Sequence, residues 1–384
     1  MNFKKALIVC LIPAFVISGC GKTTREEANN TTNQETLAQV SGQGTGQDTE
    51  QDTEKTESSG TEASSDDESQ DAEVSRDLFA MDTYMTLTAY GEHAQEAVDK
   101  AAERVEALDA LLSTGDENSE IYQLNQKGEA TLSEDGGYLV ERALELYKKT
   151  DGAFDIAIYP VMQAWGFPTQ EYHVPNDATL KDRLTLADAS KVNYDKDTRK
   201  ISFDRDGMEI DLGGIAKGYT SAQIMQIYQD CGVTSGLVNL GGNVQALGCK
   251  TDGSKWKVAI QSPDDTEDYL GILEIENQAV ITSGGYERYF EEDGVTYHHI
   301  IDPANGYPAD SGLISVTIVS DDGTLADGLS TSLFIMGEEK AAQFWRKNSD
   351  EFETIMETAD GKLYVTEGIA DSLTTDMDVT VIHK

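Results

Sequence analysis

The chain has 384 residues, and its 70 acidic side chains outnumber its 29 lysines and arginines, which gives a formal net charge of −41 at pH 7. Nucleic-acid binding depends on clustered basic side chains that neutralise phosphates, so this charge balance argues against a nucleic-acid partner. An acidic surface also repels anionic lipid, and any membrane attachment must therefore come from something other than a basic patch. The length is enough for one large domain or two ordinary ones.

Residues 1–20 have the pattern of an export signal. Two lysines form a basic start, and the apolar run from Ala6 to Ile17 is too short for a comfortable membrane span. The run ends in Ile17-Ser-Gly-Cys20, which resembles a bacterial lipobox, so we expect the Cys20 thiol to carry a diacylglycerol. The alternative is an ordinary signal peptide with a chance cysteine. The expected product is a cell-membrane lipoprotein on the extracytoplasmic face.

Residues 21–75 contain no aromatic side chain and are rich in Thr, Gln, Glu, Ser and Asp. Such a segment cannot bury enough apolar surface to offset the entropy of ordering it, so we expect a disordered acidic linker. This linker would hold the folded part away from the membrane. The folded domain is expected at residues 76–384.

The folded part mixes helical and strand patterns in an order that predicts an α+β fold in a single large domain. Alternating apolar residues predict strands, and apolar residues at helical spacing predict helices. The expected strands lie at 81–90, 201–210, 237–240, 258–260, 272–275, 279–283, 314–319, 362–365 and 379–382, and the expected helices at 94–112, 133–147, 216–228 and 326–336.

The stretch Asp211-Leu-Gly-Gly-Ile-Ala-Lys-Gly-Tyr219 places an acid, adjacent glycines and a lysine where a strand is expected to turn into a helix. Glycines let a ligand approach the backbone closely, and a helix start offers unpaired N–H groups to an anion. The stretch therefore fits a site for an anionic ligand, and it also fits a glycine turn with a solvated lysine.

Asp327, Ser330 and Thr331 are spaced so that their oxygens border one face at the expected start of a helix. A carboxylate with hydroxyls suits a hard cation such as Mg²⁺, whereas an N-capping acid followed by a back-bonded Thr is the structural alternative. His298 and His299 precede a sharp turn, where a histidine can act as a base near neutral pH or merely bond to the turn.

Other segments leave two interpretations open. Thr282-Ser-Gly-Gly-Tyr-Glu-Arg288 suits phosphate or ribose contact, and equally a plain turn with a surface Glu–Arg pair. The turn-rich aromatic segment from Gly152 to Pro168 suits a core plug or a wall against a planar ligand. Cys231 and Cys249 can form a disulfide or remain free thiols, and neither lies in a recognisable nucleophile context. Walker-type, dinucleotide-fingerprint and zinc-type spacings are absent from the sequence.

Taken together and in this order, these segments resemble the FAD:protein FMN transferase family, the ApbE-type flavin transferases. The resemblance covers the chain from about Met81 to Gly337. It rests on Met81-Asp-Thr83, Gly152-Ala-Phe-Asp155, Pro160 through Trp165-Gly166, Asp211 to Tyr219, Gly241-Gly-Asn243, Thr282 to Arg288, His299-Ile-Ile-Asp-Pro303 and Ala326-Asp-Gly-Leu-Ser-Thr331.

The resemblance implies an ApbE-type domain with FAD as its substrate and Mg²⁺ as its cofactor. It also implies roles for particular residues, with His299 as the base of the reaction. On this basis the FAD contacts are Met81, Ala153, Phe154, Asp155, Asp211, Lys217 and Ile301, the metal ligands are Asp327, Ser330, Thr331 and the carbonyl oxygen of Gly214, and the catalytic residues are His299, Asp327 and Lys217.

Two positions depart from the family pattern. Gly115 stands in the loop 113–121 where many relatives carry a Tyr, so an aromatic contact to the flavin or adenine is missing or supplied elsewhere. Asp82 stands where Gly is usual, which leaves the backbone less conformational freedom.

The reaction implied by the resemblance cleaves the diphosphate of FAD and leaves FMN on a Thr or Ser hydroxyl of an exported or membrane redox protein, with AMP released. The implied partners are FAD, acceptor proteins of membrane or extracytoplasmic electron-transfer systems, and the membrane through the lipid on Cys20. Two alternatives stay open: an FAD pyrophosphatase, in which water replaces the hydroxyl, and a lipoprotein that binds FAD without turnover.

Overall fold

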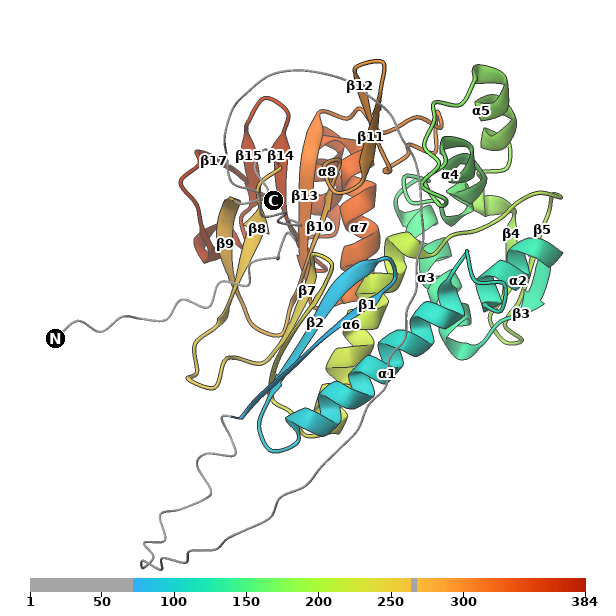
Figure 1. Cartoon of the computed structure of the whole chain (residues 1–384). Helices are drawn as coiled ribbons and strands as arrows, with labels where there is room; N and C mark the ends of the chain where they lie inside the picture. Colours follow the sequence, from blue (N-terminus) through green and yellow to red (C-terminus); the bar gives the residue numbers. More distant parts are fainter. Residues whose placement is uncertain (1–71, 264–267) are drawn as a thin grey trace, which may run out of the picture. The chain divides into compact units, whose positions relative to one another are not determined.

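The computed structural model of the chain describes residues 72–263 and 268–384 (Figure 1). Its first strand, β1 (Glu73–Ala80), begins inside the stretch that we assigned to the linker, so the ordered part starts earlier than residue 76. The rest of that linker and the expected export signal with Cys20 lie outside the described residues. Within the described ranges, none of the helices combines the length and the apolar character that a membrane crossing requires.

A nine-stranded sheet forms the centre of the described domain. Neighbouring strands in it are antiparallel, except that β15 and β17 run parallel. In spatial order the strands are β1, β2 (Thr83–Tyr90), β6 (Ser235–Leu240), β7 (Asn243–Leu247), β10 (Ala279–Gly284), β13 (Leu313–Ser320), β14 (Glu353–Thr358), β15 (Leu363–Thr366) and β17 (Val379–Ile382).

The two faces of this sheet are buried in different hydrophobic cores, because successive residues of a strand point to opposite sides. On β6, Leu237 packs in a core with Trp256, whereas the adjacent Val238 packs in a core with Val105. The first core lies under a three-stranded sheet of β16 (Leu373–Thr374), β9 (Tyr269–Ile275) and β8 (Trp256–Gln261). The helices α1 (Ala94–Leu112), α6 (Gly213–Asp230), α7 (Gly323–Met336) and α8 (Glu338–Lys347) pack on the other face (Figure 1).

The remaining elements complete the domain. They include a second three-stranded sheet in the order β3-β5-β4 and a separate hairpin of β11 and β12. Their bounds are α2 (Glu120–Lys127), β3 (Glu129–Thr131), α3 (Glu134–Lys149), η1 (Ile156–Ile158), α4 (Tyr159–Trp165), α5 (Asp177–Leu184), η2 (Ala189–Lys191), β4 (Val192–Asp195), β5 (Lys200–Phe203), β11 (Tyr289–Glu292), β12 (Val295–His298) and η3 (Ala370–Ser372).

Several expected elements are confirmed, and others differ from the expectation at one end. The helix at 94–112 has the expected bounds, and Ser133 caps α3 by accepting from the Gly136 N–H at 3.1 Å. The expected strand 201–210 ends at Phe203. Ile210, just before Asp211, has no strand partner among the described residues. Its N–H donates to the side-chain oxygen of Asn125, and its carbonyl accepts from the Asn125 amide, each at 2.8 Å. Those two bonds satisfy backbone groups that a strand partner would otherwise take.

The helix expected to open at Ala326 starts earlier. Its N-cap is Asp322, whose carboxylate accepts from the Leu325 N–H at 3.0 Å. Asp327 therefore lies inside α7 rather than at its start, and the alternative that it is merely the capping acid is wrong.

The aromatic segment forms a core plug. Trp165 is fully buried, and its indole N–H donates to the carbonyl of Gly306 at 2.8 Å. The rings of Phe290, Tyr297 and Tyr307 lie around it, with centroids 5.3–6.3 Å away. Elsewhere in the domain, Cys231 and Cys249 are both free thiols.

We predict that Trp165→Ala lowers the free energy of unfolding by about 3–5 kcal/mol, because it removes a large buried ring and leaves the Gly306 carbonyl without its donor. Urea unfolding followed by circular dichroism measures the change. Tyr269→Ala is the control, since its side chain is half exposed and its loss is expected to cost less than about 0.5 kcal/mol. Equal losses for both variants would contradict the assignment of Trp165 to the core.

Candidate active site

The helices α6 and α7 cross at a point where only glycine fits. A Cβ at Gly218 would lie 2.6 Å from the Cβ of Asp327 and would also collide with the carbonyl oxygen of Gly323. On the other helix, a Cβ at Gly323 would lie 2.9 Å from the carbonyl oxygen of Gly218. The missing side chains let the two backbones approach closely. As a result, the Asp327 side chain lies directly against α6 at Gly218, the residue that follows Lys217.

The Asp327 carboxylate is held by two donors from different elements. One oxygen accepts from the backbone N–H of Gly218 at 2.8 Å, and the other accepts from the side-chain amide of Asn243 at 3.0 Å. Asp327 is only 4% exposed. Charge-assisted bonds of this kind stabilise a carboxylate that has lost most of its water. Asn243 is part of the motif Gly241-Gly-Asn243, but the sequence alone assigned no role to it. Its role becomes visible only in the tertiary contact with Asp327.

Three hydroxyl groups gather beside this carboxylate. The Ser330 hydroxyl donates to the carbonyl of Asp327 at 2.8 Å, as expected for a serine inside a helix. Ser283 of β10 adds a hydroxyl oxygen 2.8 Å from that of Ser330 and 3.4 Å from that of Thr331. The expected metal residues 327, 330 and 331 are therefore together. Ser283 is an additional polar neighbour of this set. It belongs to the segment 282–288 that the sequence singled out, but the sequence predicted no role for this particular residue.

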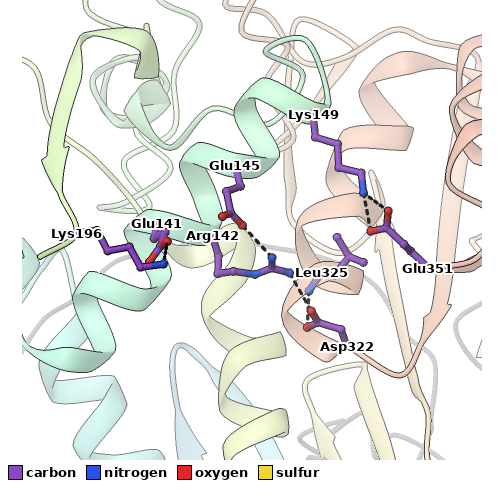
Figure 2. A network of polar contacts seen from close by, with 8 residues as sticks. All are labelled: Glu141, Arg142, Glu145, Lys149, Lys196, Asp322, Leu325 and Glu351. Carbon is purple, nitrogen blue, oxygen red and sulfur yellow. Dashed lines mark hydrogen bonds and ion pairs between the residues drawn. The ribbon is translucent and has the colours of Figure 1, made fainter.

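The start of α7 is fixed to α3 by the polar contacts of Figure 2. Arg142 donates to the Asp322 carboxylate at 2.9 Å and to Glu145 at 3.0 Å, so the residue that caps α7 is itself anchored. Lys149 pairs with Glu351 at 2.5 Å nearby. These pairs are partly exposed and individually worth little; they link α3 to the N-cap of α7 and to the loop after α8.

The beginning of α6 is joined to the segment 153–155. The N–H of Asp211 donates to the carbonyl of Ile156 at 2.9 Å, and the Asp211 carboxylate accepts from the Gly213 N–H at 2.7 Å. The Phe154 ring lies against Gly214, where a Cβ would be 3.1 Å from it. Two of the expected FAD-contacting segments, 153–155 and 211–217, are thus adjacent although they are far apart in sequence.

Asp155 has a structural task within this arrangement. Its two carboxylate oxygens accept from the N–H groups of Ala157 at 2.8 Å and Ala189 at 3.2 Å. Burial raises the pKa of Asp155 to about 6, and those two hydrogen bonds counteract part of the increase. Its side chain thus fixes the turn that presents Phe154 to α6.

Met81 reaches the same region from the turn between β1 and β2. Its N–H donates to the Asp109 carboxylate at 3.0 Å, and the Thr220 hydroxyl lies 3.8 Å from its sulfur. Burial raises the pKa of Asp211, and the nearby charge of Asp82 raises it further. The hairpin turn is therefore close to the start of α6, as the expected FAD contacts at Met81 and Asp211 require.

The ionisable groups beside Lys217 have unusual proton affinities. The surrounding protein raises the pKa of Glu287 to about 7, mainly by removing water; Lys217 counteracts this, and Asp327 adds to it. Burial lowers the pKa of His299 to about 4, and the charges of Lys217 and Arg288 lower it further. Shifted carboxyl and imidazole groups around one cation are typical of functional sites. Arg288 donates to the Phe167 carbonyl, and within the described residues it forms no ion pair with Glu287.

His299 is held in one tautomer. Its Nδ1 lies 3.1 Å from the carbonyl oxygen of Arg288, and because a carbonyl only accepts, Nδ1 must carry the proton. Nε2 then has a free lone pair and can accept a proton. His298, by contrast, bonds the carbonyl of Ala309 at 3.1 Å and packs edge-on against Phe334, so it belongs to the core.

Ile301 is the expected FAD contact with the least direct connection to the others. Its side chain is 5% exposed and packs in the aromatic core with Trp165, and its backbone bridges to Pro308. Ile301 is two residues after His299, so its backbone lies near the His299 imidazole.

The donor set around Asp327 can be compared with the needs of a hard cation. Residues 72–263 and 268–384 contain no group of three or more His, Cys, Asp or Glu that could hold a metal. The expected set has a single carboxylate, two hydroxyls and the Gly214 carbonyl. The Gly218 N–H, which is the ordinary helical partner of that carbonyl, donates to Asp327, so the Gly214 oxygen has capacity for another partner. These oxygen ligands fit Mg²⁺.

The fold and site define an α+β protein in which a helix start and the neighbouring lysine suit an anionic substrate. The profile of the ApbE family matches residues 81–356, and the chain belongs to this family. It is 34% identical over 262 residues to a FAD:protein FMN transferase of Klebsiella pneumoniae (strain 342), covering 67% of this chain and 81% of the relative. A Treponema pallidum (strain Nichols) protein of the same name is 34% identical over 296 residues, covering 72% and 82%.

Solved structures agree with this assignment. The crystal structure of an ApbE protein from Thermotoga maritima superposes with a TM-score of 0.73 at 29% identity, covering 77% of this chain and 98% of that one. The flavin transferase ApbE from Vibrio cholerae superposes with a TM-score of 0.70 at 28% identity, covering 77% and 97%. The expected α+β ApbE-type domain is confirmed.

We predict that Lys217→Met raises the pKa of both His299 and Glu287, because the lysine charge disfavours the imidazolium and favours the carboxylate. Carbon-13 NMR titrations of labelled His and Glu side chains measure both midpoints. Lys340→Met, which removes an exposed charge on α8, is the control and should leave both midpoints unchanged. Midpoints that stay fixed, or that move in opposite directions, would show that Lys217 does not face both groups.

Proposed function

We propose that this chain takes FAD, cleaves its diphosphate and attaches FMN to a Thr or Ser hydroxyl of another protein. The hydroxyl oxygen bonds to the phosphorus of the FMN half, the bond from that phosphorus to the bridging oxygen breaks, and AMP leaves. The observation that carries the proposal is the α6–α7 crossing, which joins Asp327 to the helix of Lys217 through the 2.8 Å bond to Gly218. Curated members of the family carry the name of this activity.

We further propose that Mg²⁺ takes part, held by Asp327, Ser330, Thr331 and the Gly214 carbonyl. A bound magnesium ion would neutralise negative charge on the diphosphate oxygens, which otherwise repel the attacking oxygen. The protein prepares this place by holding the Asp327 carboxylate with two donors, at 2.8 and 3.0 Å. Lys217, which immediately precedes Gly218 in α6, contributes a second positive charge near the start of this helix.

His299 is proposed as the base. With Nδ1 committed to the Arg288 carbonyl, its Nε2 can take the proton of the incoming hydroxyl. A pKa of about 4 keeps the free imidazole neutral at pH 7, so that it is ready to accept. The anionic diphosphate of a bound substrate would offset the charges of Lys217 and Arg288, which lower this pKa, and would thereby stabilise the imidazolium.

We also propose that the protein is a membrane lipoprotein anchored through Cys20, with a linker from residue 21 to the first strand at Glu73 between anchor and domain. The support is the sequence pattern at residues 1–20 and the composition of the linker. The acceptors would then be exported or membrane redox proteins. Metabolic labelling with a radioactive or alkyne-bearing fatty acid tests the anchor, and loss of the label in Cys20→Ala is the expected result.

The transfer assay incubates the full chain with FAD, Mg²⁺ and a protein that the Vibrio cholerae relative modifies, and mass spectrometry follows the acceptor. The expected result is a mass gain of one FMN together with release of AMP. Free FMN and AMP without acceptor would favour the pyrophosphatase. Bound FAD without any AMP would favour the non-catalytic binding protein. Failure to modify an acceptor that the relative modifies would contradict the transferase.

In this assay, Asp327→Ala should reduce transfer below detection, because the metal set loses its carboxylate. The variant also leaves the Gly218 N–H and the Asn243 amide unpaired, which should cost about 1–3 kcal/mol for each buried group while the domain remains folded. Asp321→Ala, an exposed acid just before α7, is the matched control. Full activity of the Asp327 variant would remove the metal proposal.

His299→Ala should lower the rate constant of transfer by about 10²–10⁴-fold, the usual contribution of a general base. FAD affinity, measured by quenching of flavin fluorescence, should change little, because His299 acts on the incoming hydroxyl. His173→Ala removes an exposed histidine and serves as the control. A normal rate constant with weaker FAD binding would make His299 a binding residue instead of the base.

A further inference from the structure

One edge of the Phe154 ring contacts both helices of the site. Its Cε2 atom would lie 3.1 Å from a Cβ at Gly214 of α6 and 3.6 Å from a Cβ at Gly328 of α7. The first distance is tighter than an ordinary van der Waals contact, and the second is an ordinary one. Phe154 is only 5% exposed. The ring therefore fills the space between the two helices at this level, and a glycine on each helix leaves room for it.

These two contacts lie beside the oxygen atoms that we propose as metal ligands. Gly214 itself supplies the carbonyl oxygen, and Gly328 directly follows Asp327 in α7. The backbones of the helices meet at Gly218 and Gly323, so the ring touches α6 about one turn before that meeting point and α7 about one turn after it. Asp327 therefore lies between two contacts that together fix the separation of α6 and α7.

The backbone on both sides of the ring is held in place. The N–H of Phe154 donates to the Thr150 hydroxyl at 3.1 Å, and this hydroxyl donates to the carbonyl of Leu146 at 2.7 Å. The Leu146 side chain itself packs on Gly328, where a Cβ would be 2.5 Å from its Cδ1 atom. On the other side of the ring, both oxygens of the Asp155 carboxylate accept from backbone N–H groups. The ring is thus a spacer with a fixed position.

The separation of the two helices matters because cations differ in the geometry that they require. Mg²⁺ needs nearly octahedral ligands at about 2.0–2.1 Å, whereas Ca²⁺ accepts a flexible arrangement at about 2.3–2.6 Å. Ligands on two different helices keep the stricter geometry only while surrounding groups hold those helices in place. Loosening the helices should therefore weaken the binding of Mg²⁺ more than that of Ca²⁺.

We propose that Phe154 is a positioning residue that makes the site select Mg²⁺ over larger cations, because its ring holds the Gly214 carbonyl and the Asp327 carboxylate at a fixed separation. This inference rests on the proposed magnesium site. In this role the ring acts through the two glycines that it contacts and does not touch the cation. The role is separate from the FAD contact that the family resemblance implies for Phe154.

The test measures cation binding directly. The probe is Mn²⁺, whose electron paramagnetic resonance signal falls on binding, and Mg²⁺ or Ca²⁺ displaces it from the full chain, with and without FAD and in the absence of an acceptor. Phe154→Leu keeps an apolar side chain but removes the ring edge, so it should weaken Mg²⁺ binding about tenfold and Ca²⁺ binding less. Phe154→Ala should enlarge this difference.

Phe352→Leu is the matched control. Its ring is comparably buried, at 4% exposure, and packs against Phe344 of α8 instead of the two helices of the site. Both leucine variants should lower the melting temperature, because each removes buried apolar surface. Only the variants at Phe154 should change the ratio of the Mg²⁺ and Ca²⁺ affinities.

The remaining outcomes separate this role from the proposals on which it rests. An unchanged affinity ratio in both Phe154 variants, or an equal change in Phe352→Leu, would overturn the positioning role and leave the transferase intact. A wild-type chain that transfers FMN without binding Mn²⁺ would overturn the metal proposal and this inference with it. Absence of transfer, with the expected affinity ratios in all variants, would overturn the proposed function and leave this inference standing.

Discussion

The close crossing of α6 and α7 is the constraint on which the site depends. Gly218 and Gly323 lie opposite each other, and a Cβ on either would meet the backbone of the other helix. Glycine inside a helix costs about 1 kcal/mol relative to alanine, and here the cost is offset by contact along both helices. The same approach lets the Asp327 carboxylate accept from a backbone N–H of α6. A side chain at either glycine would therefore push the Asp327 carboxylate away from the Gly218 N–H.

The ionisable groups around Lys217 have shifted pKa values, and these shifts suit an anionic substrate. The lysine lowers the pKa of Asp211, of Glu287 and of His299, although burial dominates each shift. Near pH 7 the result is a neutral imidazole at His299 and a carboxyl group close to half protonation at Glu287. Fewer negative charges thus face an incoming diphosphate than a count of acidic residues would suggest. Burial, which is costly for isolated charges, makes this possible.

The sequence was informative where a local pattern determines the structure. Helix 94–112, the Ser133 cap and the buried Trp165 follow from periodicity, capping chemistry and aromatic content. It was misleading at residues 208–210, where alternation suggested a strand but the Asn125 side chain satisfies the backbone. It also placed the start of α7 too late, because apolar spacing does not reveal that Asp322 is the cap. The roles of Asn243, Ser283 and Glu287 arise from tertiary contacts, so no spacing rule could have assigned them.

The turn at Met81 and Asp82 brings the β1–β2 hairpin close to the start of α6. A glycine at position 82 would adopt its left-handed backbone freely, whereas Asp82 adopts it at φ 59° under restraint. The restraint comes from both sides, because Met81 is bonded to α1 and Thr83 packs on the β6–β7 turn. A turn fixed in this way keeps Met81 and Asp82 in one position relative to Asp211. Transfer between two macromolecules benefits from such rigidity, since each loose contact would add ordering entropy to the barrier.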